Sequence, residues 1–228
     1  MQLIFLHGAA SGPEIWSRQR RHYPRALYFT YPKTDADPVS LLRVYADAVL
    51  AMMRPPTIII GHSLGGAVAE LCAARIKTGL AGLVLVGTGP RLPVNPELLA
   101  GLIHHPSDTL QQVARWSLAK GAPGPLVDRS EELARAAEPA LAYRQFAACG
   151  HFDLTGEAPL PHSTAIIWGA QDRMTPPPLI RELFPLFPHH TTDEIPDAGH
   201  LVMLEQPDAF NRALAGALKR FGCKPGAD

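Results

Sequence analysis

Short apolar runs recur along the chain, and longer stretches with a helical spacing of apolar residues separate them. The runs richest in Ile, Val and Leu cover residues 3–6, 27–30, 57–60, 83–86 and 165–168. Such nearly continuous runs are typical of strands that helices cover on both faces of a parallel sheet. A weaker run at residues 192–195 predicts an edge strand. The alternation of these runs with helices predicts the α/β class, with a mostly parallel sheet of about six strands flanked by helices.

Three segments with helical periodicity predict helices that flank this sheet. In residues 39–53 the apolar positions recur three or four residues apart, and a Pro-Pro pair ends the pattern. The Ala- and Leu-rich stretch 63–77 predicts a second helix, with Gly79 as its expected C-terminal cap. The third predicted helix covers residues 207–220.

Between Gly89 and about His162 the strand signals disappear, and helical segments interrupted by Pro and Gly take over. The helices predicted there cover residues 96–103, 107–120 and 129–149, and the last of them contains Pro139, which can break it. The chain is therefore predicted to consist of a core, residues 1–88 and 163–228, and a helical lid or cap, residues 89–162, inserted in that core.

Length and composition fit one globular domain. The chain has 228 residues, of which 46% are apolar and 18% charged, enough for a single sizeable core. Lys plus Arg and Asp plus Glu number 21 each, so the formal net charge is zero. No overall electrostatic attraction to nucleic acid or to an anionic membrane is therefore expected. We therefore expect a small-molecule partner, no nucleic acid and no stable membrane insertion. No pattern predicts an oligomeric state.

The cysteines and the N-terminal residues show no motif for a disulfide, a metal site or a targeting signal. Cys72, Cys149 and Cys223 are odd in number and form no CxxC or Cys/His ligand pattern, so neither structural disulfides nor a metal are expected. The N-terminal residues lack the basic segment, apolar stretch and cleavage site of a secretion signal. No run approaches the ~20 apolar residues of a membrane helix. These features predict a cytoplasmic protein.

The strongest chemical signal is the G-x-S-x-G sequence from Gly61 to Gly65, with Ser63 at its centre. It directly follows a predicted strand and opens a predicted helix, the context of a nucleophile on a sharp strand-to-helix turn. The two glycines leave room where a Cβ would collide with neighbouring backbone, and the turn exposes the serine hydroxyl. A glycine-rich turn can also arise by chance, but the strand and helix on either side favour Ser63 as a nucleophile.

A serine hydroxyl needs a base within hydrogen-bond reach to attack at neutral pH. His200 lies between the last predicted strand and the last predicted helix, at the sheet edge where open α/β sheets gather their chemistry. Asp172 follows the run 165–168 in the same way, although such a residue alone also fits a turn or a helix cap. The chain order Ser63, Asp172, His200 favours a catalytic triad.

The other histidines are weaker candidates for the base. His151 falls in the insertion and lacks a strand before it. His7, after the first strand, is expected to hydrogen-bond within its own loop, since a triad requires one base. We expect solvated side chains for the histidines in the insertion or in Pro-rich surface stretches, namely His104, His105, His162, His189 and His190.

The oxyanion that forms during acyl transfer requires backbone donors. The Leu64 N–H, at the start of the helix after the serine, is the first candidate, and the helix dipole favours negative charge there. The turn His7-Gly8-Ala9-Ala10 is placed to supply a second N–H, from Ala9.

These segments together resemble the α/β-hydrolase superfamily, specifically its small esterase-like members with a helical lid. The resemblance covers nearly the whole chain and includes the HG turn with Trp16 downstream, the GHSLGG elbow, the WGAQDRMTPP turn, the AGHLVMLEQPDAF segment and the closing helix. It implies the triad and the two oxyanion donors named above, and a lid over the acyl pocket. Members of the family usually have two further strands before the HG strand, which here begins at residue 2; the resemblance therefore implies a sheet that lacks them.

Substrate specificity depends on the shape of the pocket, and the lid is the segment least readable from sequence. The candidate pocket residues are Leu102, Trp116, Leu118 and Phe146, each of which also fits an ordinary buried contact. They favour an uncharged acyl chain, and we expect cleavage of short-chain carboxylic esters without a metal or organic cofactor.

Other functions fit the same residues. The triad could open a lactone, hydrolyse a carbon–carbon bond in a dienoic diketone, or act as a perhydrolase or haloperoxidase-like enzyme. The chain could instead be a ligand-binding sensor with a slow triad, which would show a kcat far below the usual ~1–10³ s⁻¹. A purely structural role is disfavoured, because it would not require a Ser, an Asp and a His to follow strands in this order.

Overall fold

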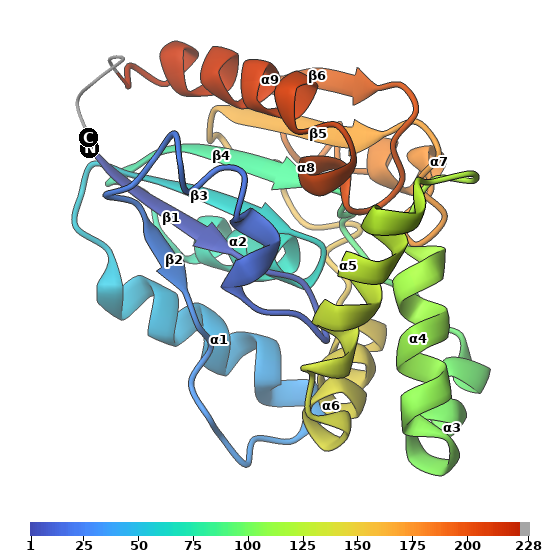
Figure 1. The fold of residues 1–228 in the computed structure, drawn as a ribbon. Helices are drawn as coiled ribbons and strands as arrows, with labels where there is room; N and C mark the ends of the chain where they lie inside the picture. The colour runs from blue at the N-terminus through green and yellow to red at the C-terminus, as the bar shows by residue number, and fades with distance from the viewer. Residues whose placement is uncertain (224–228) are drawn as a thin grey trace.

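The structure is a computed structural model that describes residues 1–223. Its described residues form a six-stranded sheet in the order β2-β1-β3-β4-β5-β6, and all five pairings are parallel (Figure 1). The strands are β1 Gln2–Leu6, β2 Leu27–Phe29, β3 Thr57–His62, β4 Leu80–Val86, β5 Thr164–Gly169 and β6 His190–Ile195. Every predicted strand is present. The prediction that the run at residues 192–195 lies at an edge is confirmed, because β6 ends the sheet.

Alternate side chains of the central strands pack into two separate cores. Ile59 and Leu85 face the core under α1 (Pro38–Met52), α2 (Leu64–Arg75) and α7 (Pro177–Arg181). Ile60 and Val86 face the core under α9 (Pro207–Arg220), α8 (Val202–Glu205) and the 3₁₀ helix η1 (Pro13–Trp16). Figure 1 shows α1 and α9 on opposite sides of the sheet. Both faces are therefore buried, which explains why the strand sequences lack polar alternation.

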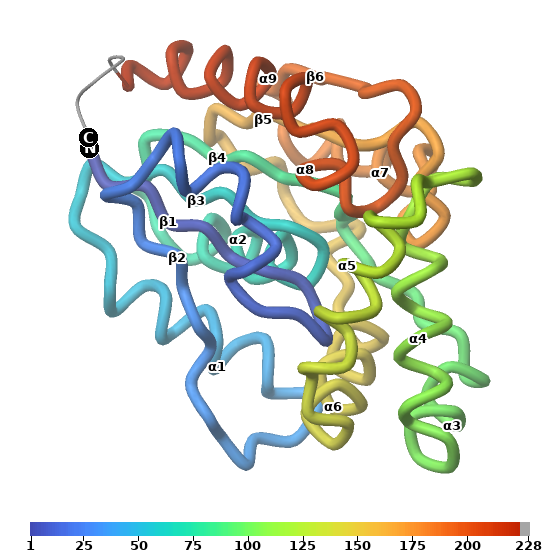
Figure 2. Tube along the Cα trace, in the orientation of Figure 1, coloured from blue at the N-terminus to red at the C-terminus, as the bar shows by residue number. Residues whose placement is uncertain are grey.

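Four helices connect β4 to β5, and we call them the cap helices. They are α3 Pro96–His104, α4 Pro106–Trp116, α5 Gly124–Arg135 and α6 Pro139–Gly150. Their apolar side chains form a third hydrophobic cluster that also takes in Ala10, from the loop after β1. Figure 2 shows these four helices gathered to one side of the sheet, beyond the ends of the central strands.

The stretch predicted as one helix, 129–149, is broken at Pro139, as the sequence allowed, because α5 ends at Arg135 and Pro139 opens α6, where a missing N–H costs nothing. Two of the bounds predicted for this connection are wrong. One is the start of that stretch, because α5 already begins at Gly124. The predicted helix 107–120 ends at Trp116. Its next carbonyl, that of Ser117, accepts hydrogen bonds from the amides of His200 and Leu201, and the chain turns toward that loop.

The predicted C-terminal cap of α2 is also wrong. The helix ends at Arg75, and Ile76 is already extended, with φ −117° and ψ 135°. Gly79 instead has a φ of +91° in the turn before β4, which suits a residue without a Cβ. None of the helices within residues 1–223 is long and apolar enough to span a bilayer.

Candidate active site

Ser63 occupies the tight turn between β3 and α2. Its φ of +54° and ψ of −120° lie outside the ordinary regions for a residue with a side chain, which is a strained conformation. The Ser63 amide donates to the Val86 carbonyl at 2.9 Å, and the Ser63 carbonyl accepts from Gly66 N–H at 2.8 Å. A Cβ on Gly65 would lie 2.6 Å from the Leu6 carbonyl oxygen. The neighbouring backbone thus holds the turn and leaves room for glycine alone.

His200 and Asp172 form a buried pair beside this turn. His200 Nδ1 lies 2.8 Å from Asp172 Oδ2, and only 6% of the histidine side chain and none of the aspartate side chain is exposed. The carboxylate can only accept, so Nδ1 carries the proton and Nε2 is left as the basic nitrogen. The other carboxylate oxygen, Oδ1, accepts from the amides of Met174 and Thr175, each at 2.9 Å. Both oxygens of the aspartate are therefore hydrogen-bonded, which holds the carboxylate against the imidazole.

Thr175 is a member of this cluster that the sequence reasoning missed. Its hydroxyl lies 2.8 Å from the Gly87 carbonyl, 2.9 Å from Asp172 Oδ2 and 3.1 Å from His200 Nδ1. The Thr175 hydroxyl can donate its one proton to the Gly87 carbonyl or to Asp172 Oδ2, while His200 Nδ1–H donates to the same carboxylate oxygen. The sequence feature that could have indicated Thr175 is its position three residues after Asp172, within the same turn.

Ser63 and His200 line the same two cavities. The smaller cavity, about 60 Å³, lies between the loop after β1 and helices α4 and α5. The larger, about 210 Å³, extends past the segment that follows β4. Of the four candidate pocket residues, Trp116 lines the larger cavity and Phe146 lines both. Leu102 is instead buried in the cluster of the cap helices and Leu118 in the core beside α9, and neither lines these two cavities.

The loop after β1 is the second wall of the smaller cavity, and Gly8, Ala9, Ala10 and Ser11 all line it. Within residues 1–223, neither the Ala9 amide nor the Leu64 amide donates a hydrogen bond to another group of the chain. Both amides predicted as oxyanion donors are therefore free of hydrogen bonds to the described residues. His7 is buried, and its Nδ1–H donates to the Gly8 carbonyl at 2.9 Å, so its predicted role within the loop is confirmed.

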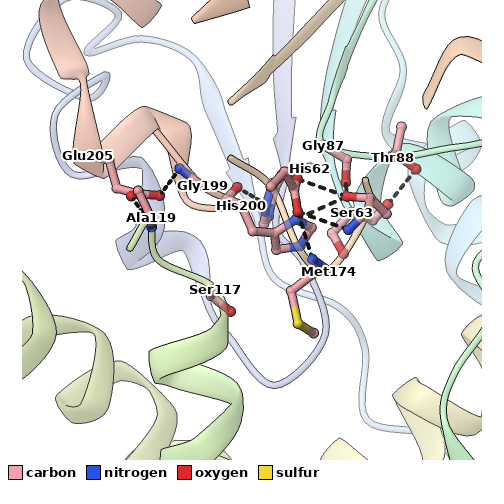
Figure 3. A network of polar contacts seen from close by, with 12 residues as sticks. His62, Ser63, Gly87, Thr88, Ser117, Ala119, Met174, Gly199, His200 and Glu205 are labelled. Carbon is pink, nitrogen blue, oxygen red and sulfur yellow. Dashed lines mark hydrogen bonds and ion pairs between the residues drawn. The ribbon is translucent and has the colours of Figure 1, made fainter. Parts of the chain in front are cut away.

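A partly buried glutamate links the histidine loop to the segment after α4, and the sequence reasoning missed it. Glu205 accepts from Gly199 N–H at 2.9 Å and from Ala119 N–H at 2.7 Å, as Figure 3 shows. Burial raises its pKa above that of an ordinary glutamate. The His200 amide donates to the Ser117 carbonyl at 2.8 Å. The end of α4 is therefore attached directly to the loop that carries the histidine.

Two further groups at the site, His62 and Cys149, are of types that can act as a base or a nucleophile. Their surroundings suit neither of them to that role. The His62 ring packs 4.5 Å from the His200 ring, and its Nε2–H donates to the His200 carbonyl at 3.0 Å. Burial, followed by the neighbouring His200, lowers the pKa of His62 well below 6.5, which keeps the ring neutral. Cys149 lines the larger cavity, but burial raises the pKa of its thiol to about 12, so it is no nucleophile at neutral pH.

One expectation about the other histidines is wrong. His162 was expected to be solvated, but it is buried and its Nε2 lies 3.0 Å from the Ala73 carbonyl. The Pro-rich stretch that carries it leads into β5 and passes the C-terminal end of α2, where unpaired carbonyls are available. Among the described residues, no three His, Cys, Asp or Glu side chains are grouped as metal ligands would be.

The fold and this site define a class of protein, and comparison with known proteins agrees. The model of the alpha/beta hydrolase family matches residues 3–213, and the chain belongs to that family. A pimeloyl-[acyl-carrier protein] methyl ester esterase of Aromatoleum aromaticum is 33% identical over 100 residues, which is 42% of this chain and 40% of that protein. The match thus spans less than half of that relative.

Solved structures extend the likeness to nearly the whole chain. A thermophilic esterase superposes with a TM-score of 0.80 at 25% identity, covering 97% of this chain and 90% of the other. The enol-lactonase from Burkholderia xenovorans LB400 superposes with a TM-score of 0.82 at 18% identity, covering 96% and 91%. At that lower identity the likeness concerns the fold.

Proposed function

We propose that this chain is a serine hydrolase that cleaves carboxylic esters with a small acyl group through an acyl-enzyme on Ser63. The observation that carries the proposal is the buried His200–Asp172 pair, whose histidine lines the same two cavities as Ser63 on its strained turn. The relatives described as esterases, at 33% and 25% identity, support ester chemistry.

In the first half of the reaction, Ser63 Oγ attacks the ester carbonyl carbon while His200 Nε2 takes its proton. The carbonyl oxygen becomes an oxyanion that accepts hydrogen bonds from Ala9 N–H and Leu64 N–H. Asp172 stabilises the imidazolium through Nδ1–H. Collapse of the intermediate breaks the bond to the alcohol oxygen, which takes the proton from His200 Nε2 and departs.

In the second half, water enters the site and His200 Nε2 takes one of its protons. The resulting hydroxide attacks the acyl carbon, and the same two amides stabilise the second oxyanion. Collapse breaks the bond to Ser63 Oγ, which recovers its proton from the imidazolium, and the carboxylic acid leaves. Every proton that His200 takes up is returned within the same half-reaction.

The two cavities have different walls, which supports a small acyl group. Val113, Ala134 and Phe146 are among the mostly apolar residues that narrow the smaller cavity next to the oxyanion loop. The larger cavity is lined by Trp116 and by the polar side chain of Arg173. The small acyl group is assigned to the first cavity and the alcohol to the second.

A chain-length series of p-nitrophenyl esters tests the proposal. We expect the highest kcat/KM for acetate or butyrate and a value about 10- to 100-fold lower for decanoate, since the smaller cavity cannot hold the added methylenes. Phe146→Ala should shift the optimum to longer chains because Phe146 narrows both cavities. Phe184→Ala is the matched control, since Phe184 lines neither cavity. Equal rates at all lengths would contradict the assignment of the smaller cavity to the acyl group.

The same assays separate the other candidate functions. Lactones and dienoic diketones can replace the ester in turn, and peroxide can replace water as the nucleophile that attacks the acyl-enzyme. A kcat below about 10⁻² s⁻¹ on all of them, with tight binding of one ligand, would identify a sensor instead of an enzyme.

A further inference from the structure

A cap helix is hydrogen-bonded directly to the predicted oxyanion loop. Gln145 lies on α6, is 2% exposed, and its Oε1 accepts a hydrogen bond from the Ala10 amide at 2.9 Å. The two residues are 135 positions apart in the sequence. Ala10 has a φ of +49°, a left-handed conformation that is costly for a residue with a Cβ. The hydrogen bond to Gln145 therefore helps to hold Ala10 in this unfavourable conformation.

The loop is fixed by side chains on both sides of Ala9. On one side, the Gly8 carbonyl accepts from Ser11 Oγ–H and from His7 Nδ1–H, each at 2.9 Å. In a trans peptide the N–H lies in the same plane as the C=O and points in the opposite direction, so these bonds aim the Ala9 N–H away from Ser11 Oγ and His7 Nδ1. On the other side, the next peptide is fixed through its own N–H, that of Ala10, by Gln145.

We infer that Gln145 is a positioning residue for the oxyanion hole, which rests on the proposed function because the role of Ala9 belongs to it. The Ala10 amide is occupied by Gln145, so Ala9 is the neighbouring amide that stays available to the substrate. The other contacts of Ala10 with the cap helices are apolar and impose no direction on the peptide. The cap thus helps to orient a catalytic donor as well as to enclose the pocket.

Gln145→Met tests the inference, since it keeps the length of the side chain and removes the acceptor. Loss of a whole oxyanion donor costs about 10²- to 10³-fold in kcat, and a displaced donor should cost less, about 10- to 100-fold, with KM nearly unchanged. Affinity for a trifluoromethyl ketone, which forms an oxyanion on the serine, should fall by the same factor. Affinity for the matching secondary alcohol, which forms none, should not change.

Gln145→Glu is the rescue variant because it retains an acceptor at the same place, and its kcat should stay within about threefold of wild type. Thr109→Val is the matched control. It removes a hydroxyl that donates to the His105 carbonyl inside the cap, away from the loop and both cavities. It should lower thermal stability slightly and leave kcat unchanged. If Gln145→Met does not fold, Gln145→Asn withdraws the acceptor by one methylene and should fall between wild type and full loss.

The inference is overturned if Gln145→Met matches Thr109→Val in kcat and in affinity for the ketone. It is equally overturned if kcat falls while the ketone and the alcohol weaken together, because a purely structural role produces that result. Failure of the proposed function has a different signature: Ser63→Ala would then keep wild-type activity, whatever the glutamine variants do.

Discussion

Replacement of Ser63 by alanine is expected to lower kcat/KM for p-nitrophenyl acetate by about 10⁴- to 10⁶-fold. The reason is that the other hydroxyls and the thiol that line the two cavities are not activated. Ser11, Ser117 and Ser130 line the smaller cavity, and each donates its hydroxyl proton to a backbone carbonyl. Cys149 lines the larger cavity, but burial holds the pKa of its thiol at about 12. His200 would have only water to activate. The measurement is steady-state hydrolysis at neutral pH with the folded state checked by thermal unfolding.

The control is Ser107→Ala, which removes a hydroxyl from an exposed position in the first turn of α4. It should stay within about twofold of wild type, as most exposed substitutions do. Combining Ser63→Ala with His200→Ala should add little, because the two side chains act on the same step. A Ser63→Ala variant as active as the control would end the catalytic assignment.

Gly61→Ala is expected to destabilise the protein by about 3 kcal/mol, a large effect for one methyl group. An added Cβ would overlap the Gly65 carbonyl group and lie 2.8 Å from Gly66 N, all of it backbone of the turn that carries Ser63. Backbone cannot rotate away as a side chain can. Each kcal/mol shifts Tm by about 2–4 °C in a domain of this size, so the loss is roughly 6–12 °C.

Gly216→Ala is the matched control for this substitution. Gly216 lies in the middle of α9, and the nearest atom to an added Cβ is Arg220 Nη1 at 3.6 Å, an ordinary contact. The same change should therefore raise stability there by about 0.5–1 kcal/mol, since alanine favours the helix. Equal Tm changes for the two variants, in sign and size, would contradict the steric account of the turn.

The sheet and the three triad candidates could be predicted from sequence because their signals are local. Uninterrupted apolar runs identify strands buried on both faces, and each candidate follows a strand or opens the helix after one. Parallel strands bring their C-terminal ends to one edge, so residues as distant as Ser63 and His200 reach the same cavities. Position at this edge, between the last predicted strand and the last predicted helix, was the reason for choosing His200 among ten histidines.

The contacts between the cap and the core could not be predicted in the same way. Gln145 with Ala10, and Glu205 with Ala119, each pair a side chain with a backbone amide far away in the chain. Neither has a period or a motif, because a backbone donor is the same at every residue. For the same reason Leu102 was assigned to the pocket, although it packs inside the cap. Apolar periodicity shows that a helix has a buried face and leaves its neighbour undetermined.

Covalent labelling tests the central claim most directly. A fluorophosphonate reacts with a serine that a neighbouring base activates, and peptide mass spectrometry then identifies the modified residue. The account predicts a single adduct on Ser63, formed in step with loss of esterase activity and formed far more slowly in His200→Ala. An adduct on another residue, or loss of activity with Ser63 unmodified, would contradict it.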